Sequence, residues 1–291
     1  MNCFEGVITK GIGGFYYVDT DNQLVECRAR GVLRKRGLTP LVGDRVIIEK
    51  SDSSHGVINE IKDRKSILIR PAVANVTQMV AVVAQSSPKP NPYILDKLIA
   101  SAEFAGLSVA ICFNKSDLCE DEELIKAYQT AGFKVILTSA LEHSGIETLG
   151  DFLKDEITVF AGNSGVGKSS LINELMMREV FETGKVSQKL ERGRHTTRHS
   201  ELVQLPFGGY IIDTPGFSSF DVNTIPLENL AAMFREFTDF MGDCRFPDCS
   251  HRSEPDCSVR RAVNEGRIAK SRHESYVQIN GEVKAARENI Y

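Results

Sequence analysis

The sequence predicts a multidomain protein with an N-terminal β-barrel, a central α/β domain and a mainly helical C-terminal region. Short β-type segments separated by Gly, Asp, Asn and Ser fill residues 1–70. From about residue 77, apolar strand-like runs alternate with amphipathic segments of helical length, which is typical of a sheet covered by helices on both faces. After about residue 224 the strand-like runs stop, and helical segments such as LENLAAMFREFTDF (227–240) flank a Cys/His cluster. We therefore expect domains at 1–70, 71–223 and 224–291.

Length and composition exclude several classes of protein. A chain of 291 residues, of which 42% are hydrophobic, can bury the cores of two or three domains. The net charge of −4 argues against a wholly basic nucleic-acid binder. The first residues lack the apolar core of a signal peptide and the longest apolar runs are too short to span a bilayer, so we expect a cytoplasmic protein with no membrane partner. In that compartment the seven cysteines favour thiols or metal ligands over disulfides.

The N-terminal β-type segments are expected to form a small barrel, for which an OB-fold is the natural arrangement. The segments cover residues 6–20, 23–30, 44–50 and 56–63 and show no convincing helical period. The link that ends at Pro71 marks the boundary of this domain. The barrel domain carries a basic run, which contains Arg28, Arg30, Arg34, Lys35 and Arg36. Such a run suits contact with RNA phosphates, and ordinary surface charge explains it as well.

The central domain is expected to contain a parallel, doubly wound sheet. The first strand candidates are QMVAVVAQ, LSVAICF and FKVILTSA, separated by the helical segments YILDKLIASAEFAG and DEELIKAYQTAG. ITVFAG, HSELVQLP and GYIIDTPG are later strand candidates. In such a sheet, ligands bind at the carboxyl ends of the strands, wherever the chain begins.

A glycine-rich loop between a strand and a helix fits the phosphate-binding pattern. It comprises Gly162, Asn163, Ser164, Gly165, Val166, Gly167, Lys168, Ser169 and Ser170. The glycines let backbone N–H groups turn towards phosphates, the Lys168 ammonium reaches the β- and γ-phosphates, and the Ser169 hydroxyl ligates Mg²⁺. The segment from Asp213 to Gly216 completes this half of the site: Asp213 would hold Mg²⁺ through water, and the Gly216 N–H would meet the γ-phosphate.

A second motif predicts that the nucleotide carries guanine. Asn114, Lys115, Ser116 and Asp117 close a strand. The Asp117 carboxylate can accept hydrogen bonds from the ring N–H and the amine of guanine, which adenine does not offer, so an ATP-using enzyme is disfavoured. We expect Lys115 to lie over the base and Asn114 to tie this loop to the phosphate loop. Ser139 and Ala140 follow the next strand, where the Ala140 N–H can meet the guanine oxygen.

The order of these motifs is reversed relative to an ordinary GTP-binding domain, in which the phosphate loop comes first. If the N- and C-termini of an ordinary domain are joined and new termini are opened elsewhere, the site keeps its structure. Only the order of its motifs along the sequence changes. The sequence therefore predicts a circularly permuted domain. The chain runs on from the Asp213–Gly216 motif into the C-terminal region. A loop ordered by the γ-phosphate would therefore act on that region as a switch. The alternative is that the C-terminal region is attached to the domain without any switching role.

A basic segment stands where the first switch loop is expected. Its cations are Lys185, Lys189, Arg192, Arg194 and Arg198. One of its threonines should bind Mg²⁺ in the GTP state, and similarity to related GTPases favours Thr197 over Thr196. Many GTPases orient the attacking water with a glutamine where this chain has Phe217, so intrinsic hydrolysis should be slow. His195 is the candidate for the missing group, although contact with RNA or packing of the loop explains it as well.

The C-terminal cluster has the composition of a metal site. Cys244, Cys249, His251 and Cys257 follow the pattern C-x₄-C-x-H-x₅-C. Three thiolates and an imidazole form a complete tetrahedral set for structural zinc with no open position, although the irregular spacing leaves unrelated thiols as an alternative. The other cysteines show no comparable spacing and are expected to be buried or idle.

Together these features closely resemble the ribosome small subunit-dependent GTPase A family. The resemblance covers essentially the whole chain: the barrel, the permuted motifs NKSD, GNSGVGKSS and DTPGFSS, and the cysteine region. It implies hydrolysis of GTP to GDP and phosphate, stimulated by the small (30S) ribosomal subunit and acting in late maturation of that subunit. It also implies one structural zinc, Mg²⁺ with the bound nucleotide, and an rRNA-binding role for the barrel.

The expected partners are GTP and the small ribosomal subunit with its rRNA, and we expect the protein to be a monomer. The residues expected to act in hydrolysis are Lys168, Ser169, His195, Thr197, Asp213 and Gly216. The alternative hypothesis is a GTP-regulated rRNA-binding module whose hydrolysis only ends the bound state.

Overall fold

The computed structural model describes residues 3–20, 23–69, 72–118, 121–176, 201–213 and 221–288. The chain divides into two compact units, each built from segments that are distant in the sequence. The first unit comprises Met1–Gln78, Gly150–Val159 and Leu175–Ser219, and the second comprises Met79–Leu149, Phe160–Glu174 and Phe220–Tyr291. Within the described ranges, no helix is both long and apolar enough to cross a membrane.

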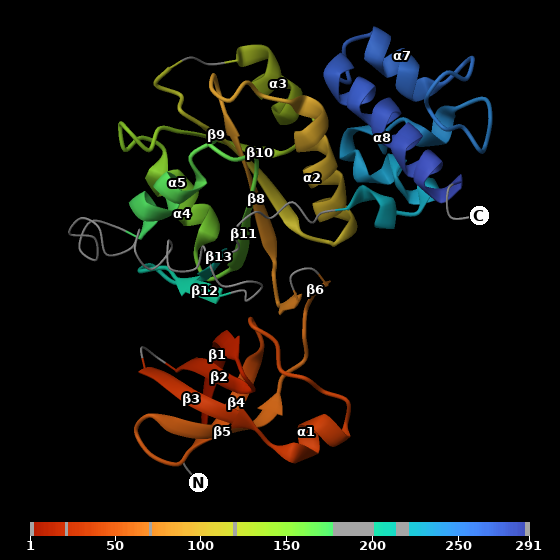
Figure 1. The fold of residues 1–291 in the computed structure, drawn as a ribbon. Helices are drawn as coiled ribbons and strands as arrows, with labels where there is room; N and C mark the ends of the chain where they lie inside the picture. The colour runs from red at the N-terminus through yellow and green to blue at the C-terminus, as the bar shows by residue number, and fades with distance from the viewer. Residues whose placement is uncertain are drawn as a thin grey trace. The chain divides into compact units, whose positions relative to one another are not determined.

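The N-terminal strands of the first unit form the predicted closed, OB-like barrel (Figure 1). The strands are β1 (Cys3–Ile12), β2 (Phe15–Thr20), β3 (Gln23–Ala29), β4 (Arg45–Lys50) and β5 (His55–Ile61). They follow the order β1-β2-β3-β5-β4, and β4 pairs again with β1, which closes the sheet. A helix that the sequence did not predict, α1 (Gly31–Lys35), carries part of the basic run.

The remaining strands of the first unit show one departure from the sequence-based prediction. β6 (Ile67–Ile69) and β7 (Ala72–Ala74) form a short ribbon. β11 (Ile157–Ala161) pairs parallel with β13 (Tyr210–Asp213), but β12 (Glu201–Gln204) pairs antiparallel with β13. The prediction that all strands of this sheet are parallel is therefore wrong for β12. A tight turn explains the reversal, because Gly208 and Gly209 both have positive φ and the Leu205 N–H donates to Gly209 O.

The second unit holds the other strands of the central domain and most residues of its helices. β8 (Gln78–Ala84), β9 (Ser108–Asn114) and β10 (Lys134–Thr138) are adjacent in the order β10-β9-β8, and β9 and β10 are parallel. The helices are α2 (Pro92–Phe104), α3 (Glu122–Thr130), α4 (Ile146–Leu153) and α5 (Lys168–Leu175). Asn91 caps α2 by accepting from the Ile94 N–H, and Asp121 caps α3 by accepting from the Leu124 N–H. These caps fix where the chain enters the helices, close to the carboxyl ends of β8 and β9.

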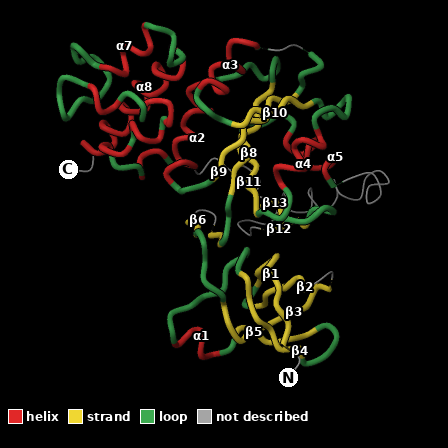
Figure 2. The backbone as a smooth tube through the Cα atoms, turned by 180° about the vertical axis from the view of Figure 1, so that it is seen from behind, coloured by secondary structure: helices red, strands yellow, loops and turns green. Residues whose placement is uncertain are grey.

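The C-terminal part of the second unit is helical, and its longest helix lies along α2 (Figure 1, Figure 2). It contains α7 (Ser258–Asn264) and α8 (Lys270–Glu288), preceded by the 3₁₀ turns η2 (Val222–Thr224), η3 (Leu227–Asn229), η4 (Ala231–Met233), η5 (Arg235–Phe237) and η6 (Met241–Asp243). The segment 227–240 was predicted to be helical, and it forms consecutive 3₁₀ turns. Phe234 has φ −102° and ψ 85°, which ends η4.

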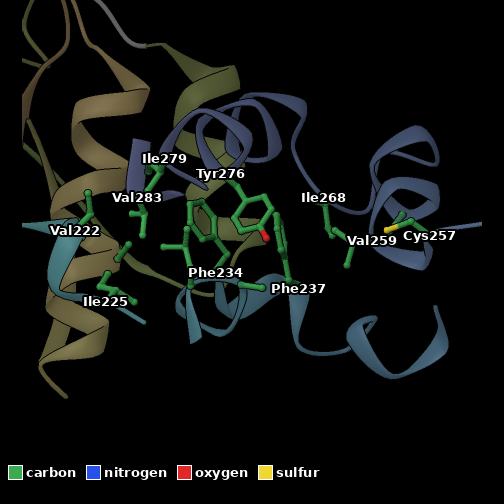
Figure 3. Packing of buried hydrophobic residues seen from close by; sticks show 14 residues of the cluster. Val222, Ile225, Phe234, Phe237, Cys257, Val259, Ile268, Tyr276, Ile279 and Val283 are labelled. Atoms are coloured by element: carbon green, nitrogen blue, oxygen red, sulfur yellow. The ribbon is translucent and has the colours of Figure 1, made fainter. Parts of the chain in front are cut away.

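A buried aromatic cluster holds these turns against α8 (Figure 3). The rings of Phe234 and Phe237 lie 5.3 and 5.0 Å from the ring of Tyr276 on α8, centroid to centroid. All three side chains are at most 1% exposed. Burial of large aromatic side chains contributes strongly to stability, so this cluster provides the rigid support for the cysteine region that follows.

Candidate nucleotide site and metal centre

The phosphate-binding loop joins β11 to α5 in a conformation that requires glycine. The φ angles of Gly162, Gly165 and Gly167 are 145°, 81° and 95°. A Cβ at Gly162 would lie 2.2 Å from Val82 O, and a Cβ at Gly167 would lie 2.2 Å from Asn114 Nδ2, so neither position has room for a side chain. The loop can therefore present its backbone to a ligand at close range.

The lysine of this loop lies within the loop itself. The half-buried Lys168 donates from Nζ to Gly162 O at 2.7 Å and to Asn163 O at 2.8 Å. Burial lowers the pKa of Lys168. Both of these partners are neutral carbonyls, and a half-buried ammonium gains energy when an anion approaches, which is the property that a phosphate-binding lysine needs.

A buried asparagine joins the guanine motif to the phosphate loop. Asn114, at the end of β9, is 1% exposed and donates from Nδ2 to Val166 O at 2.9 Å. Its Oδ1 accepts from the Thr138 hydroxyl at 3.2 Å. These bonds connect the ends of β9 and β10 with the phosphate loop, so residues 52 positions apart form one polar site.

The guanine-reading carboxylate is held by the motif that follows β10. Asp117 Oδ1 accepts from the Ser139 hydroxyl at 2.5 Å, which orients the carboxylate. Lys115 has φ 64° and donates from Nζ to Ser87 O at 2.5 Å. The Ala140 N–H, expected to face the guanine oxygen, lies at a long 3.4 Å from Asn114 Oδ1 and is therefore only weakly engaged.

Several predicted site residues fall outside this geometry. Asp213 ends β13 in the first unit, where its backbone is opposite Glu201. His195, Thr196, Thr197, Gly216 and Phe217 lie outside the described residues, as do all the cations of the basic segment 185–198. Their roles stay predictions.

The Cys/His cluster comes together in the C-terminal part of the second unit. One ligand atom from each of Cys244, Cys249, His251 and Cys257 lies within 4.8 Å of the others. The Sγ atoms of Cys244 and Cys257 are 3.9 Å apart, and each lies 3.5 Å from His251 Nδ1. Tetrahedral zinc with ordinary bond lengths requires separations of about 3.8 Å between sulfurs and about 3.6 Å between sulfur and nitrogen. The cluster therefore has the dimensions of a tetrahedral metal site.

The surroundings of two of these four ligands, Cys244 and His251, favour the forms that bind a metal, whereas burial raises the pKa of Cys249 to about 12 and also raises the pKa of Cys257. Burial opposes ionisation of Cys244, yet hydrogen bonds from the Ser258 hydroxyl and N–H lower the pKa of this thiol. Burial lowers the pKa of His251, which favours the neutral imidazole. A thiolate and a neutral imidazole are the states that coordinate metal.

A carboxylate that sequence analysis missed organises the loop around His251. Glu254 Oε1 accepts from the Ser250 N–H at 2.8 Å, and its Oε2 accepts from the N–H groups of Arg252 and Ser253 at 3.0 Å. Burial works against the charge, yet hydrogen bonds from Ser250 and from backbone N–H groups lower the pKa of Glu254 to about 2. His251 has φ 58°, a conformation rarely adopted by residues with side chains, and the carboxylate stabilises it by binding the N–H groups on both sides.

The fold and the nucleotide site define a phosphate-loop GTPase domain with circularly permuted motifs. Family models agree: residues 61–223 match the RsgA GTPase model and residues 5–58 match the RsgA N-terminal domain model. The chain belongs to the RsgA GTPase family and is a GTPase.

Relatives and solved structures extend this similarity to the whole chain. The chain is 47% identical over 294 aligned positions to the small ribosomal subunit biogenesis GTPase RsgA of Caldanaerobacter subterraneus, covering 100% of this chain and 99% of the relative. The crystal structure of YjeQ from Thermotoga maritima has a TM-score of 0.81 and 35% identity, covering 97% of this chain and 98% of that one. YloQ, described as a circularly permuted GTPase, has a TM-score of 0.80 and 33% identity, covering 98% and 96%. The permutation inferred from motif order is thus shared with a solved structure.

Proposed function

We propose that this protein hydrolyses GTP to GDP and phosphate on the small ribosomal subunit, is stimulated by that subunit, and acts late in its maturation. The observation that carries the proposal is the hydrogen bond from Asn114 to Val166 O, because it joins a guanine-reading motif to a phosphate-binding loop. The name of the Caldanaerobacter relative supports the small subunit as the place of action. A cytoplasmic location fits this role, since small subunits mature in the cytoplasm, and we propose that the protein acts as a monomer.

In this proposal the phosphate loop binds the nucleotide and neutralises the charge that develops during hydrolysis. Lys168 leaves the loop carbonyls to pair with the β- and γ-phosphates, and Ser169 with Asp213 would hold Mg²⁺. Bound Mg²⁺ would supply positive charge that offsets the charge developing on the phosphates. The Gly216 N–H would meet the γ-phosphate, Thr197 would be a further ligand of the metal, and His195 would orient the attacking water.

The barrel supports a role in RNA binding through paired cations and aromatic rings. The Arg28 guanidinium lies 4.4 Å from the centre of the Phe15 ring, and Lys50 Nζ lies 4.3 Å from the centre of the Phe4 ring. Such pairs offer both phosphate contacts and stacking surfaces to a nucleic acid. The exposed cations Arg34, Lys35 and Arg36 give the barrel further positive charge. We assign the barrel to rRNA binding.

The metal in the C-terminal cluster is proposed to be zinc in a structural role. Three thiolates and one imidazole suit zinc, and a fully ligated ion leaves no position for substrate. Because the ligands are brought together on metal binding, its binding energy becomes folding energy of residues 244–257. Metal analysis of the purified protein tests this assignment directly.

The ribosomal part of the proposal is tested by measuring phosphate release from GTP with purified small subunits, large subunits or none. We expect slow release alone and a large acceleration by small subunits only. Lys168→Ala provides the control, because it should abolish the accelerated rate without altering the barrel. Equal rates under all three conditions would remove the ribosome from the proposal and leave the GTPase activity in place.

A second candidate is a GTP-regulated rRNA-binding module in which hydrolysis only ends the bound state. The cation–aromatic pairs of the barrel favour it, because they suit RNA binding without chemistry. Release from small subunits with GTP and with a non-hydrolysable analogue separates the two. Completed maturation of the subunit with the analogue would favour the binding module.

A further inference from the structure

A buried arginine of the C-terminal region pairs with two acids and is not used by the proposed chemistry. Arg272 on α8 donates to Asp96 Oδ1 on α2 at 2.5 Å and to both carboxylate oxygens of Glu236 at 2.7 and 3.0 Å. The side chains of Arg272, Asp96 and Glu236 are 1%, 0% and 6% exposed. Burial opposes the charge of Arg272, but the charges of Asp96 and Glu236 raise its pKa above its ordinary value. A buried ionic group adds little net stability on average, and the role that we test for this one is the fixing of local geometry.

The same carboxylate reaches the helix that follows the guanine motif. The hydroxyl of Tyr128, on α3, donates to Asp96 Oδ1 at 2.8 Å, so Tyr128 and Arg272 share one acceptor. The Arg272 guanidinium also lies 5.3 Å from the centre of the Tyr128 ring. Tyr128 is fully buried, and its position is therefore set by Asp96 and Arg272.

Tyr128 contacts the strand on the other side of the guanine motif. Its ring lies 6.2 Å from the ring of Phe113, centroid to centroid, and Phe113 directly precedes Asn114. The guanine motif lies between β9, which ends at Asn114, and α3, which begins at Glu122. Tyr128 thus packs α3, which follows the motif, against β9, which precedes it. The separation of these two elements determines the orientation of the motif.

We propose that Arg272 is a positioning residue for guanine recognition, acting through Asp96, Tyr128 and Phe113 on the motif at 114–117. The inference rests on the proposed guanine-nucleotide function. Arg272 touches no part of the phosphate loop, so its loss should weaken nucleotide binding and leave the chemical step unchanged.

The same helix also reaches the metal loop. His273, the next residue on α8, places its Nε2 2.8 Å from the carbonyl oxygen of His251. The metal loop and the guanine motif therefore lie at opposite ends of one series of direct contacts within the second unit. Through Arg272, the C-terminal region takes part in nucleotide binding as well as in its own folding.

Arg235 provides a matched control because it also attaches the C-terminal region to the helices of the second unit. It pairs with Glu103 on α2, donates to Gly132 O at 3.2 Å and lies 4.1 Å from the centre of the Phe133 ring. Among the described residues it bonds neither Asp96 nor the Tyr128 hydroxyl, although the Phe133 ring that it covers lies 6.3 Å from the Tyr128 ring, centroid to centroid. Loss of Arg235 should therefore loosen attachment and leave in place the hydrogen bonds that hold Tyr128.

The experiment compares Arg272→Met, Arg272→Lys and Arg235→Met in the full-length protein. GDP affinity is measured with a fluorescent GDP analogue, KM and kcat by GTP turnover, and folding by circular dichroism and thermal unfolding. We expect Arg272→Met to weaken GDP binding and raise KM about 3- to 30-fold with kcat unchanged. Arg272→Lys should lie between this variant and wild type, because lysine keeps the charge but cannot bind both oxygens of Glu236 as arginine does. Arg235→Met should bind GDP like wild type.

Two results would overturn the inference. One is wild-type GDP affinity in a folded Arg272 variant. If Arg272→Met does not fold, this affinity is measured with Arg272→Lys, which retains the charge. The other is an equal loss of affinity in Arg235→Met, which would assign the effect to attachment of the region. Failure of the wild-type protein to bind GDP would instead contradict the proposed function, so the two failures are distinguishable.

Discussion

Replacement of Asn114 by alanine should separate the two halves of the nucleotide site. The substitution removes the donor to Val166 O at 2.9 Å and the acceptor of the Thr138 hydroxyl at 3.2 Å, both at a position 1% exposed. Loss of a partner by a buried polar group costs about 1–3 kcal/mol, so the two groups that lose a partner here cost about 2–6 kcal/mol together. Part of this cost destabilises the nucleotide-free protein and does not affect binding. We therefore expect a loss of about 2–3 kcal/mol in the free energy of nucleotide binding, which is about 30- to 150-fold weaker affinity at 1.4 kcal/mol per tenfold change.

Titration with fluorescent GDP and GTP analogues measures the loss, which should be equal for the two nucleotides because the γ-phosphate is not involved. Asn91→Ala is the matched control: it removes the cap of α2, which accepts from the Ile94 N–H at 3.3 Å, and should lower stability by about 1 kcal/mol without altering affinity. A folded Asn114→Ala protein that binds GDP within about threefold of wild type, less than 1 kcal/mol, would refute the reasoning.

Four further predictions follow from the sites. Asp117→Asn should weaken GTP binding and favour xanthine nucleotides, whose ring carbonyl suits an amide; unchanged GTP affinity in a competition assay would remove Asp117 from the site. Cys249→Ser should lose bound zinc and bind small subunits less well, as elemental analysis and co-sedimentation would show; retained zinc would exclude this residue as a ligand. Glu254→Gln should release zinc to a chelator faster than wild type, because a neutral amide holds the N–H groups around His251 less strongly. The control, Glu274→Gln on the exposed face of α8, should release zinc at the wild-type rate. His195→Ala should lose turnover stimulated by small subunits while still binding them; full stimulation would exclude the catalytic role, and lost binding would indicate an rRNA contact.

The motifs could be predicted from the sequence because each is local. The residues of the phosphate loop are consecutive, as are those of the guanine motif, and their order alone indicated the permutation. The four metal ligands also lie close together in the sequence, at positions 244–257. In each case the chemistry depends on residue types at fixed short spacing, which a single sequence displays.

Features that depend on distant contacts could not be predicted in this way. Asp96 and Arg272 are 176 positions apart, and neither belongs to a recognisable motif. The apolar alternation in 199–206 predicts a strand but not its direction, which the turn at Gly208 and Gly209 decides. The segment 227–240 forms 3₁₀ turns interrupted at Phe234, which has a non-helical φ of −102° and ψ of 85° and packs with Phe237 onto Tyr276, a tertiary contact that local periodicity does not contain.

The central claim, that a permuted chain forms one guanine-specific phosphate-loop site, is tested most directly by calorimetric titration of the wild-type protein with GDP and with ADP in the presence of Mg²⁺. The account predicts that GDP binds to one site per chain and that ADP gives no measurable binding at the same concentrations. Comparable affinity for ADP would contradict it, because the Asp117 carboxylate, held by Ser139 at 2.5 Å, would then not be reading the base.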